Sequence, residues 1–108
     1  KKQGKIRSYG MSSKTVTGGK RCVELADVAM VTYNRQYTEE KAVIDYAHEK
    51  NKGVFIKKAF ASGHHCNTPQ GIEDSLRLCL ETEGVNCVIV GTINPKHLEE
   101  NVRVVNTL

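Results

Sequence analysis

Aromatic side chains are scarce in this sequence, which has no tryptophan, four tyrosines and two phenylalanines. Its 16 basic and 12 acidic residues give a net charge of +4, and the basic residues are scattered in short clusters. A protein that binds nucleic acid usually presents a continuous basic face, often with aromatic side chains on which bases stack. Because the sequence has neither feature, we do not expect nucleic acid as a partner.

Long apolar runs are also absent, because no stretch approaches the ~18 apolar residues of a membrane span. The first residues, Lys1 to Lys5, lack the apolar core of a signal peptide. No pair among the four cysteines has CxxC spacing. Cys22, Cys79 and Cys87 lie in apolar contexts, where cysteine behaves as a small hydrophobic residue. We therefore predict reduced thiols, no membrane association and a cytoplasmic location.

Three neighbouring residues, His64, His65 and Cys66, are candidate metal ligands because imidazole and thiolate suit zinc. Adjacent residues rarely bind one ion together, and no fourth ligand is evident in the sequence. The segment is therefore predicted to be a loop without a metal site.

The chain of 108 residues is long enough for one small domain or for part of a larger one. Hydrophobic periodicity predicts strands that alternate with helices four times. The predicted strands span residues 6–11, 28–33, 54–57 and 87–90, and the predicted helices span 14–25, 38–50, 72–80 and a segment after 94. Successive strands begin roughly 22–33 residues apart, as parallel βαβ units require. Four such units form either a small open sheet or half of an eight-stranded barrel.

Local signals refine the predicted helices. Gly18 and Gly19 weaken the first helix by roughly 1 kcal/mol each relative to alanine, and we interpret them as positions of close backbone approach. Thr38 is predicted to cap the second helix. Asn94 is predicted to cap the last helix, with Pro95 at its first position, where the missing N–H costs nothing.

The stretch 87–102, CVIVGTINPKHLEENV, combines a strand, a turn and a helix. Its apolar strand is expected to be buried on both faces, as in a parallel sheet. The turn Gly91–Thr92 leads into a helix whose apolar stripe is Leu98, Val102 and Val105. The N-terminus of that helix would lie at the carboxyl end of the sheet, where unpaired N–H groups and the helix dipole favour phosphate.

This stretch resembles the last strand and helix of the aldo/keto reductase barrel, and the rest of the chain is similar to the same family in the same order. GKIRSYGMSS resembles its fifth strand, DVAMVTYN its sixth, and GVFIKKAFASG its seventh with the cofactor loop. VIVGTINPKHLEENV resembles its eighth strand and the helix over the adenosine phosphate. The resemblance implies that residues 1–108 are a single partial domain, the C-terminal half of a (β/α)8 TIM barrel made of four parallel β/α units.

The resemblance also implies an NADP(H)-dependent oxidoreductase that reduces aldehydes or ketones to alcohols, with a small carbonyl substrate. The implied cofactor contacts are Ser12 and Ser13 at the nicotinamide amide, Phe60, Ala61, Ser62 and Gly63 over the pyrophosphate, Gly91, Thr92, Ile93 and His97 at the 2′-phosphate, and Glu100 and Asn101 at the adenine amino group. A cation at the carboxyl rim of a barrel faces ligand. Whichever of Lys57 and Lys58 points inward is therefore expected to meet pyrophosphate or a substrate acid, and we assign Lys57 to the site.

Four positions depart from the family pattern. Ser13 replaces a common asparagine, and Met30 stands where a glutamine often contacts the carboxamide. Lys57 or Lys58 stands where a tyrosine usually stacks on the nicotinamide. Ile93 replaces a frequent lysine, arginine or serine near the 2′-phosphate, which leaves both NADP and NAD open.

No catalytic residue is assigned to this chain, because the family's catalytic Asp, Tyr, Lys and His lie on its first four strands. We expect the isolated chain to be inactive. It is either a fragment of a longer enzyme or a half that pairs with another copy to close the barrel, since four strands leave two open sheet edges. The alternative function is a non-catalytic nucleotide- or phosphate-binding module, or a structural half-barrel.

Overall fold

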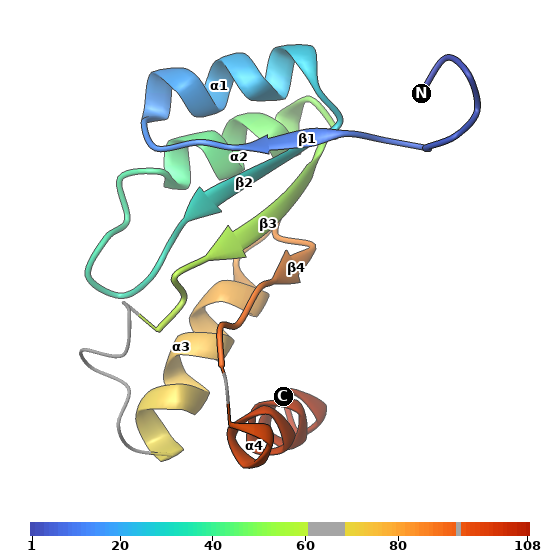
Figure 1. Ribbon diagram of the computed structural model, residues 1–108. Coiled ribbons are helices and arrows are strands. Elements are labelled where there is room, and N and C mark those ends of the chain that lie inside the picture. The colour runs from blue at the N-terminus through green and yellow to red at the C-terminus, as the bar shows by residue number, and fades with distance from the viewer. Residues whose placement is uncertain (61–68, 93) are drawn as a thin grey trace.

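Strands and helices alternate along the chain in the computed structural model, which describes residues 1–60, 69–92 and 94–108 (Figure 1). The elements are β1 (Gly10–Ser12), α1 (Val16–Leu25), β2 (Val28–Thr32), α2 (Lys41–Glu49), β3 (Gly53–Lys57), α3 (Pro69–Glu81), β4 (Cys87–Val88) and α4 (Pro95–Asn106). The predictions for Ala61, Ser62, Gly63, Ile93 and the run 64–66 fall outside the described residues.

The four strands form one parallel sheet in the order β1-β2-β3-β4. Gly10 lies opposite Val28, Val28 opposite Gly53, and Phe55 opposite Cys87. Each strand therefore lies beside the next one in the sequence, as in a barrel, whereas a doubly wound sheet reverses its strand order part-way. The predicted four parallel β/α units are confirmed.

One face of the sheet carries the apolar core. Ala29 and Val31 of β2 and Val54 and Ile56 of β3 are fully buried on this face. They pack against buried residues of the helices, which are Cys22 and Val23 of α1, Val43, Ile44 and Ala47 of α2, and Cys79 of α3. Because side chains alternate across a strand, the core fixes which residues point to the opposite face.

The opposite face of the sheet is not covered by any described element. Met30 and Thr32 of β2 and Phe55 and Lys57 of β3 alternate with the core residues, and all four side chains are half-buried. In a closed barrel this is the face that points to the interior. The sheet therefore has one face packed against helices and one open face, as expected for part of a barrel wall.

Gly10 and Gly19 each allow two neighbouring elements to approach closely. A Cβ on Gly10 would lie 2.2 Å from the backbone oxygen of Val28, so no side chain fits between β1 and β2 there. A Cβ on Gly19 would lie 2.7 Å from Cγ2 of Val43, where α1 packs on α2. The prediction that a glycine of the first helix permits close approach is confirmed at Gly19.

The two edge strands are shorter than the sequence predicts. β1 begins at Gly10, and Ile6 is 50% exposed. β4 ends at Val88 although Ile89 N–H still donates to the Ile56 oxygen at 2.8 Å. The expected burial of the last strand on both faces is wrong in this chain, because Cys87 and Val88 are half-buried and Ile89 is 44% exposed. An edge strand has a partner on one side alone, which limits both its pairing and its burial.

The predicted N-cap of α4 is observed, whereas the predicted N-cap of α2 is not. Asn94 caps α4, since its side-chain oxygen accepts from the Lys96 N–H at 2.9 Å, and Pro95 is the first helical residue. The prediction of Thr38 as a cap is wrong. The residue before α2 is Glu40, and Thr38 contributes its backbone oxygen to the Lys41 N–H at 3.1 Å.

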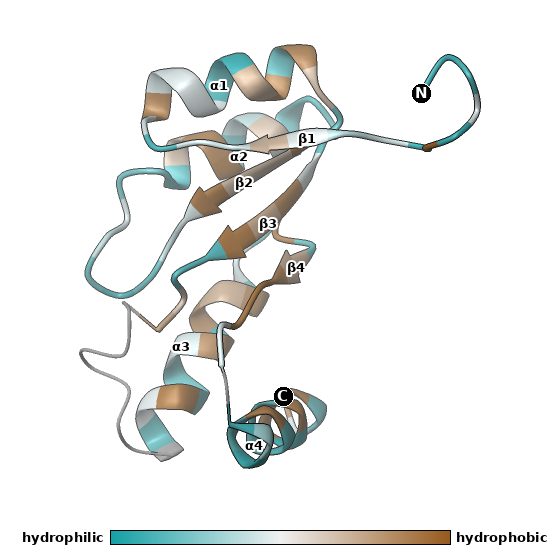
Figure 2. Ribbon diagram, in the orientation of Figure 1, coloured by the Kyte–Doolittle hydropathy of each residue, from teal (hydrophilic) through white to brown (hydrophobic). Residues whose placement is uncertain are grey.

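The last helix, α4, packs on α3 and lies away from β1 and β2 (Figure 1). Leu98 and Val102 of its predicted stripe are 51% and 52% exposed, while Asn101 and Val104 are its buried residues. A hollow of about 420 Å³ lies between the stripe, α3 and β4. Figure 2 shows this contrast, with apolar residues along β2 and β3 and mixed polarity around α4. The stripe thus borders a groove that the described chain does not fill.

Candidate site at the carboxyl edge of the sheet

The carboxyl ends of the strands bring distant parts of the sequence together. Ser12 ends β1 and lies opposite Met30, and Lys57 ends β3 and lies opposite Thr32. Parallel strands all end at one edge of the sheet, so polar side chains that follow them collect there. Ser12 and Lys57, which are 45 positions apart in the sequence, meet at this edge.

Lys57 makes the central contact of the site. Its Nζ donates to Ser12 Oγ at 2.6 Å and to the Ser13 backbone oxygen at 2.9 Å. The side chain thus reaches from β3 past β2 to the end of β1. Lys58, by contrast, is exposed and has a positive φ of 57°. The structure therefore separates the two lysines, and Lys57 is the one on the uncovered face.

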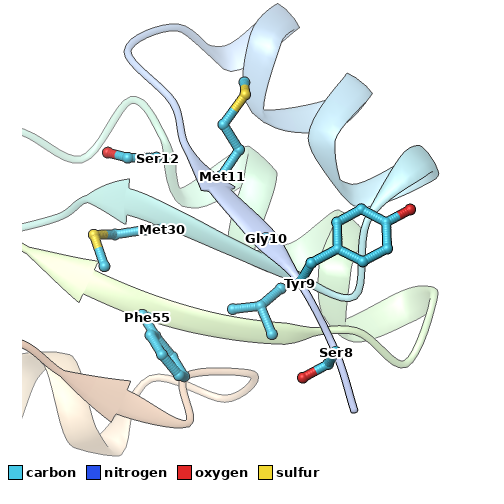
Figure 3. Close-up of a pocket in the computed structure, with 8 residues that line it drawn as sticks. Ser8, Tyr9, Gly10, Met11, Ser12, Met30 and Phe55 are labelled. Atoms are coloured by element: carbon cyan, nitrogen blue, oxygen red, sulfur yellow. The ribbon is translucent and has the colours of Figure 1, made fainter. Parts of the chain in front are cut away.

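A hollow of about 300 Å³ lies on the uncovered face beside this contact (Figure 3). Ser12 lies at its edge, and Met30 and Phe55 form part of its wall. The full lining is Ser8, Tyr9, Gly10, Met11, Ser12, Val28, Met30 and Phe55. The hollow is mostly apolar, with hydroxyl groups at its margin, as in a ligand site that positions a few polar groups on an apolar wall.

Ser13 lies behind the edge of the sheet. It is 3% exposed, its N–H donates to the Met30 oxygen at 3.0 Å, and its hydroxyl donates to Glu40 Oε1 at 3.5 Å. The Glu40 side chain is itself fully buried. The cofactor contact predicted for the Ser13 side chain stays a prediction, and in this structure that hydroxyl is directed to Glu40.

Sequence reasoning did not single out Asn34, which organises the edge beyond β2. The side chain is buried, its Nδ2 donates to the Lys58 oxygen at 3.0 Å, and its Oδ1 accepts from Gln36 and Tyr37 N–H groups at 2.9 Å. An asparagine directly after a strand commonly forms this kind of turn, which is the signal that could have revealed it. Asn34 therefore holds the start of the segment after β3, where the Phe60 side chain is half-buried against the core.

The amino end of α4 differs from the predicted phosphate cradle. The N–H groups of Lys96, His97 and Leu98 donate to Asn94 at 2.9–3.2 Å, and the Asn94 N–H donates to Thr92 Oγ1 at 3.2 Å. The expectation of unpaired N–H groups is wrong for these four amides, because oxygens of Asn94 accept from three of them and Thr92 Oγ1 accepts from the fourth. A phosphate here would meet the helix dipole and the exposed Lys96 and His97 side chains.

The remaining predicted contacts lie on or before α4 in different environments. Gly91 and His97 are exposed, and a Cβ on Gly91 would meet nothing within 4 Å. Glu100 is paired with Arg103, whose Nε lies 3.2 Å from Oε2, and this pairing raises the pKa of the Arg103 guanidinium. Asn101 is buried and lines the groove between α3, β4 and α4. Glu100 and Asn101 are adjacent in sequence, but they point to different surroundings.

Metal-ligating side chains do not cluster within residues 1–60, 69–92 and 94–108. No group of three or more His, Cys, Asp or Glu side chains there could hold a metal ion. None of the helices in those ranges is long and apolar enough to cross a membrane. Cys22, Cys79 and Cys87 are free thiols, and burial raises the pKa of the Cys79 thiol to about 11.

Two solved structures match this chain in both sequence and fold. One, a putative aldo-keto reductase from Pseudomonas aeruginosa, gives a TM-score of 0.86 and 43% sequence identity. A second, with the same description and organism, gives 0.85 and 42%. The resemblance to the aldo-keto reductase family is confirmed. Neither a family model nor a curated protein matches the sequence.

The match to the aldo-keto reductase structures defines how much of the barrel this chain represents. It covers 98% of the present chain and 40% and 39% of the two solved chains. The chain therefore spans about two fifths of the length of the aldo-keto reductases it matches, and its four-stranded sheet is a partial (β/α)8 barrel.

Proposed function

We propose that this chain is the cofactor-binding half of an NADP(H)-dependent aldo/keto reductase, an oxidoreductase that reduces aldehydes or ketones to alcohols. The observation that carries the proposal is the match to aldo-keto reductase structures at 43% identity over 98% of the chain. The arrangement of polar groups at the carboxyl edge of the sheet supports it, because that edge holds the ligand sites of barrel enzymes.

The groups at this edge fit a nicotinamide dinucleotide in their chemistry. Phosphates need cations and N–H or O–H donors. The edge offers the Lys57 ammonium and the Ser12 hydroxyl, and the first turn of α4 offers the exposed His97. In this proposal Ser12, Ser13 and Lys57 hold the nicotinamide and pyrophosphate side, with residues 60–63. Gly91 to Ile93 and His97 hold the adenosine phosphate, and Glu100 and Asn101 the adenine.

The cofactor, when bound, supplies the hydride for carbonyl reduction. The residues of this chain bind and orient it. Proton transfer to the carbonyl oxygen is assigned to catalytic residues on the first four strands of the complete barrel, which lie outside residues 1–108. We therefore expect the isolated chain to be inactive as a reductase, although it carries most of the proposed cofactor contacts.

An absorbance assay tests whether cofactor binding and catalysis belong to different halves of the barrel. A protein that contains the complete barrel is expected to oxidise NADPH in the presence of a small aldehyde, and the 108-residue chain is expected not to. Carbonyl-dependent turnover by the short chain would contradict the assignment of catalysis to the missing strands. Failure of the complete barrel with any carbonyl tested would favour the alternative, a non-catalytic nucleotide-binding module or structural half-barrel. The alternative is supported by the observation that the chain covers only about two fifths of the length of the matched reductases.

Closure of the barrel needs further strands, and we propose that these come from the missing N-terminal half or from a second copy of this chain. The open edges of β1 and β4 and the uncovered face with Met30 and Phe55 require a partner surface. Light scattering distinguishes the two sources. A dimer that forms at micromolar concentration indicates self-pairing, whereas a stable, well-folded monomer would count against it.

A cytoplasmic location remains part of the proposal. Its support is the free thiols of Cys22, Cys79 and Cys87, since disulfides are rare in reducing compartments. Fractionation of the cells that make the protein would test it.

A further inference from the structure

The Lys57 ammonium has donor capacity that the described protein does not use. An ammonium group has three N–H donors, and two are directed to Ser12 Oγ at 2.6 Å and the Ser13 oxygen at 2.9 Å. Both acceptors are uncharged. In the part of the chain that the structure describes, none of the ion pairs within 4.0 Å involves Lys57. The positive charge is therefore held in place without a carboxylate beside it.

The Lys57 ammonium lies where the absence of a carboxylate counter-ion matters most. Lys57 shares the uncovered face with Phe55 and Met30, and its side chain is half-buried there. Lys41 differs because it pairs with Asp45 at 3.0 Å, and Lys58 differs because it is exposed to solvent. Lys52 is also half-buried and donates to the Ala26 oxygen at 2.9 Å, but it precedes β3 and so lies at the amino end of the sheet. A charge that has lost part of its hydration and has no counter-ion attracts an anion strongly.

Ser12 adds a second donor to the ammonium. A hydroxyl group has one donor and two acceptor positions. Ser12 Oγ accepts from Lys57, so its own proton remains available, and no hydrogen bond donated by it to another described residue is present. The hydroxyl also lies at the margin of the 300 Å³ hollow. One N–H and one O–H donor thus lie side by side, which suits an oxygen of a carboxylate or phosphate.

We propose that Lys57 and Ser12 form an anion-binding site that takes a phosphate or carboxylate oxygen of a ligand entering the open face from the carboxyl edge. The inference rests on the proposed function for its choice of ligand. The oxygen belongs either to the cofactor pyrophosphate or to the acid group of a substrate that carries both a carbonyl and a carboxylate. In the second case the enzyme selects carbonyl acids over neutral aldehydes.

Calorimetric titrations of the purified chain test the site with two separate probes, inorganic pyrophosphate and pyruvate. Lys57→Gln removes the charge, and Lys57→Arg keeps it. Lys58→Gln is the matched control, because it removes the same charge from the neighbouring exposed position. We expect Lys57→Gln to weaken the preferred probe about tenfold or more, and Lys58→Gln to change it less than about twofold, as loss of a charge-assisted contact requires. Lys57→Arg is expected to restore most of the affinity.

Preference between the probes identifies the source of the anion. Tighter Lys57-dependent binding of pyrophosphate assigns the site to the cofactor, and tighter binding of pyruvate assigns it to an acidic substrate. Equal affinities in the Lys57→Gln and Lys58→Gln variants would overturn the proposal, as would no binding of either probe by the folded wild-type chain. If Lys57→Gln does not fold, amide shifts in the wild-type NMR spectrum decide, since the proposal requires changes centred on residues 12, 13 and 57.

A parallel NADPH titration separates this inference from the proposed function. NADPH binding that is equal in the two glutamine variants, with neither small probe bound through Lys57, would leave the reductase assignment standing and remove the anion site. Lys57-dependent binding of pyrophosphate without any NADPH binding would support the anion site and count against the reductase assignment.

Discussion

Gly10 lies at the point where β1 comes closest to β2. A Cβ there would meet the Val28 backbone oxygen at 2.2 Å, and a backbone atom cannot swing aside as a side chain can. We expect Gly10→Ala to lower the free energy of unfolding by about 1–3 kcal/mol, the usual cost of overpacking. Chemical denaturation measures this cost, with Gly91→Ala as the control because its Cβ would meet nothing within 4 Å. Equal stability of the two variants would contradict the packing of β1 on β2.

Cys79 is expected to be the slow-reacting thiol of the core. Its side chain is fully buried, its Sγ lies 3.6 Å from the Tyr33 oxygen, and burial raises its pKa from 9.0 to about 11. At pH 8 a thiol reagent should therefore modify half-buried Cys87 well before Cys79, because the thiolate is the reactive form. Mass spectrometry of the labelled peptides gives the order, and faster labelling of Cys79 would show that α3 is not docked.

The same thiol gives a stability prediction with a defined direction. Folding favours the neutral form of Cys79, so its contribution to stability is present below pH 9 and falls as pH rises through 9 towards 11. Cys79→Ala removes this dependence, although it also removes core volume. Denaturation curves at pH 8 and pH 10.5 should therefore differ more for the wild type than for the variant.

At the scale of the elements, α4 depends on its cap more than the other helices do, because it packs on α3 alone among its main contacts. Asn94→Ala removes the oxygen that accepts from the Lys96 N–H, and such losses cost about 1 kcal/mol. We expect faster hydrogen exchange in the first turn of α4 and little change in β2 and β3. Asn94→Asp keeps an acceptor at the same place and should preserve protection.

The groove beside α4 explains why the sequence predicted the position of its apolar stripe correctly but did not predict how exposed the stripe is. Leu98, Val102 and Val105 recur at helical spacing and do lie on one side of the helix, lining one groove. They stay 39–52% exposed because burial depends on the element opposite, and the described chain supplies only α3 and β4 there. Periodicity identifies an apolar face, but not whether a partner covers it.

The central strands followed the sequence more closely than the edges did. β2 and β3 each have neighbours on both sides and a helix layer, so Val28–Thr32 and Gly53–Lys57 agree with the apolar runs to within a residue. β1 and β4 lost residues at their ends because half of their pairing capacity has no partner. Thr38 failed as a cap because the buried Glu40 occupies the capping position.

The sequence predicted which residues lie at the candidate site better than it predicted the contacts of their side chains. The predicted parallel strands place Ser12 and Lys57 at the same edge of the sheet, but the hydrogen bond between them was not predicted from the sequence. The buried contact of Ser13 with Glu40 and the turn at Asn34 depend on side-chain directions behind that edge. Nothing in the spacing of the sequence specifies these directions, because they result from the packing of α2 and the loop after β2.

At the scale of the whole molecule, the structure is part of a (β/α)8 barrel, with four strands and the four helices that follow them. The matched aldo-keto reductase structures are about two and a half times as long as the chain, from coverages of 98% and 40%. The helix-covered face is packed, and the opposite face is open beside Met30 and Phe55. If the proposed function is correct, such a half binds the cofactor without catalysing reduction, since Ser12 and Lys57 already meet at its polar edge.

A titration of the purified 108-residue chain with NADPH, with NADH alongside, tests the central claim most directly. The chain has no tryptophan, so emission of the cofactor itself can be followed. The account predicts saturable binding that favours NADPH and is weakened by His97→Ala. His48→Ala is the control, because this exposed histidine lies on α2 and pairs with Glu83. A folded chain that binds neither cofactor would contradict the claim that this half holds the cofactor unaided.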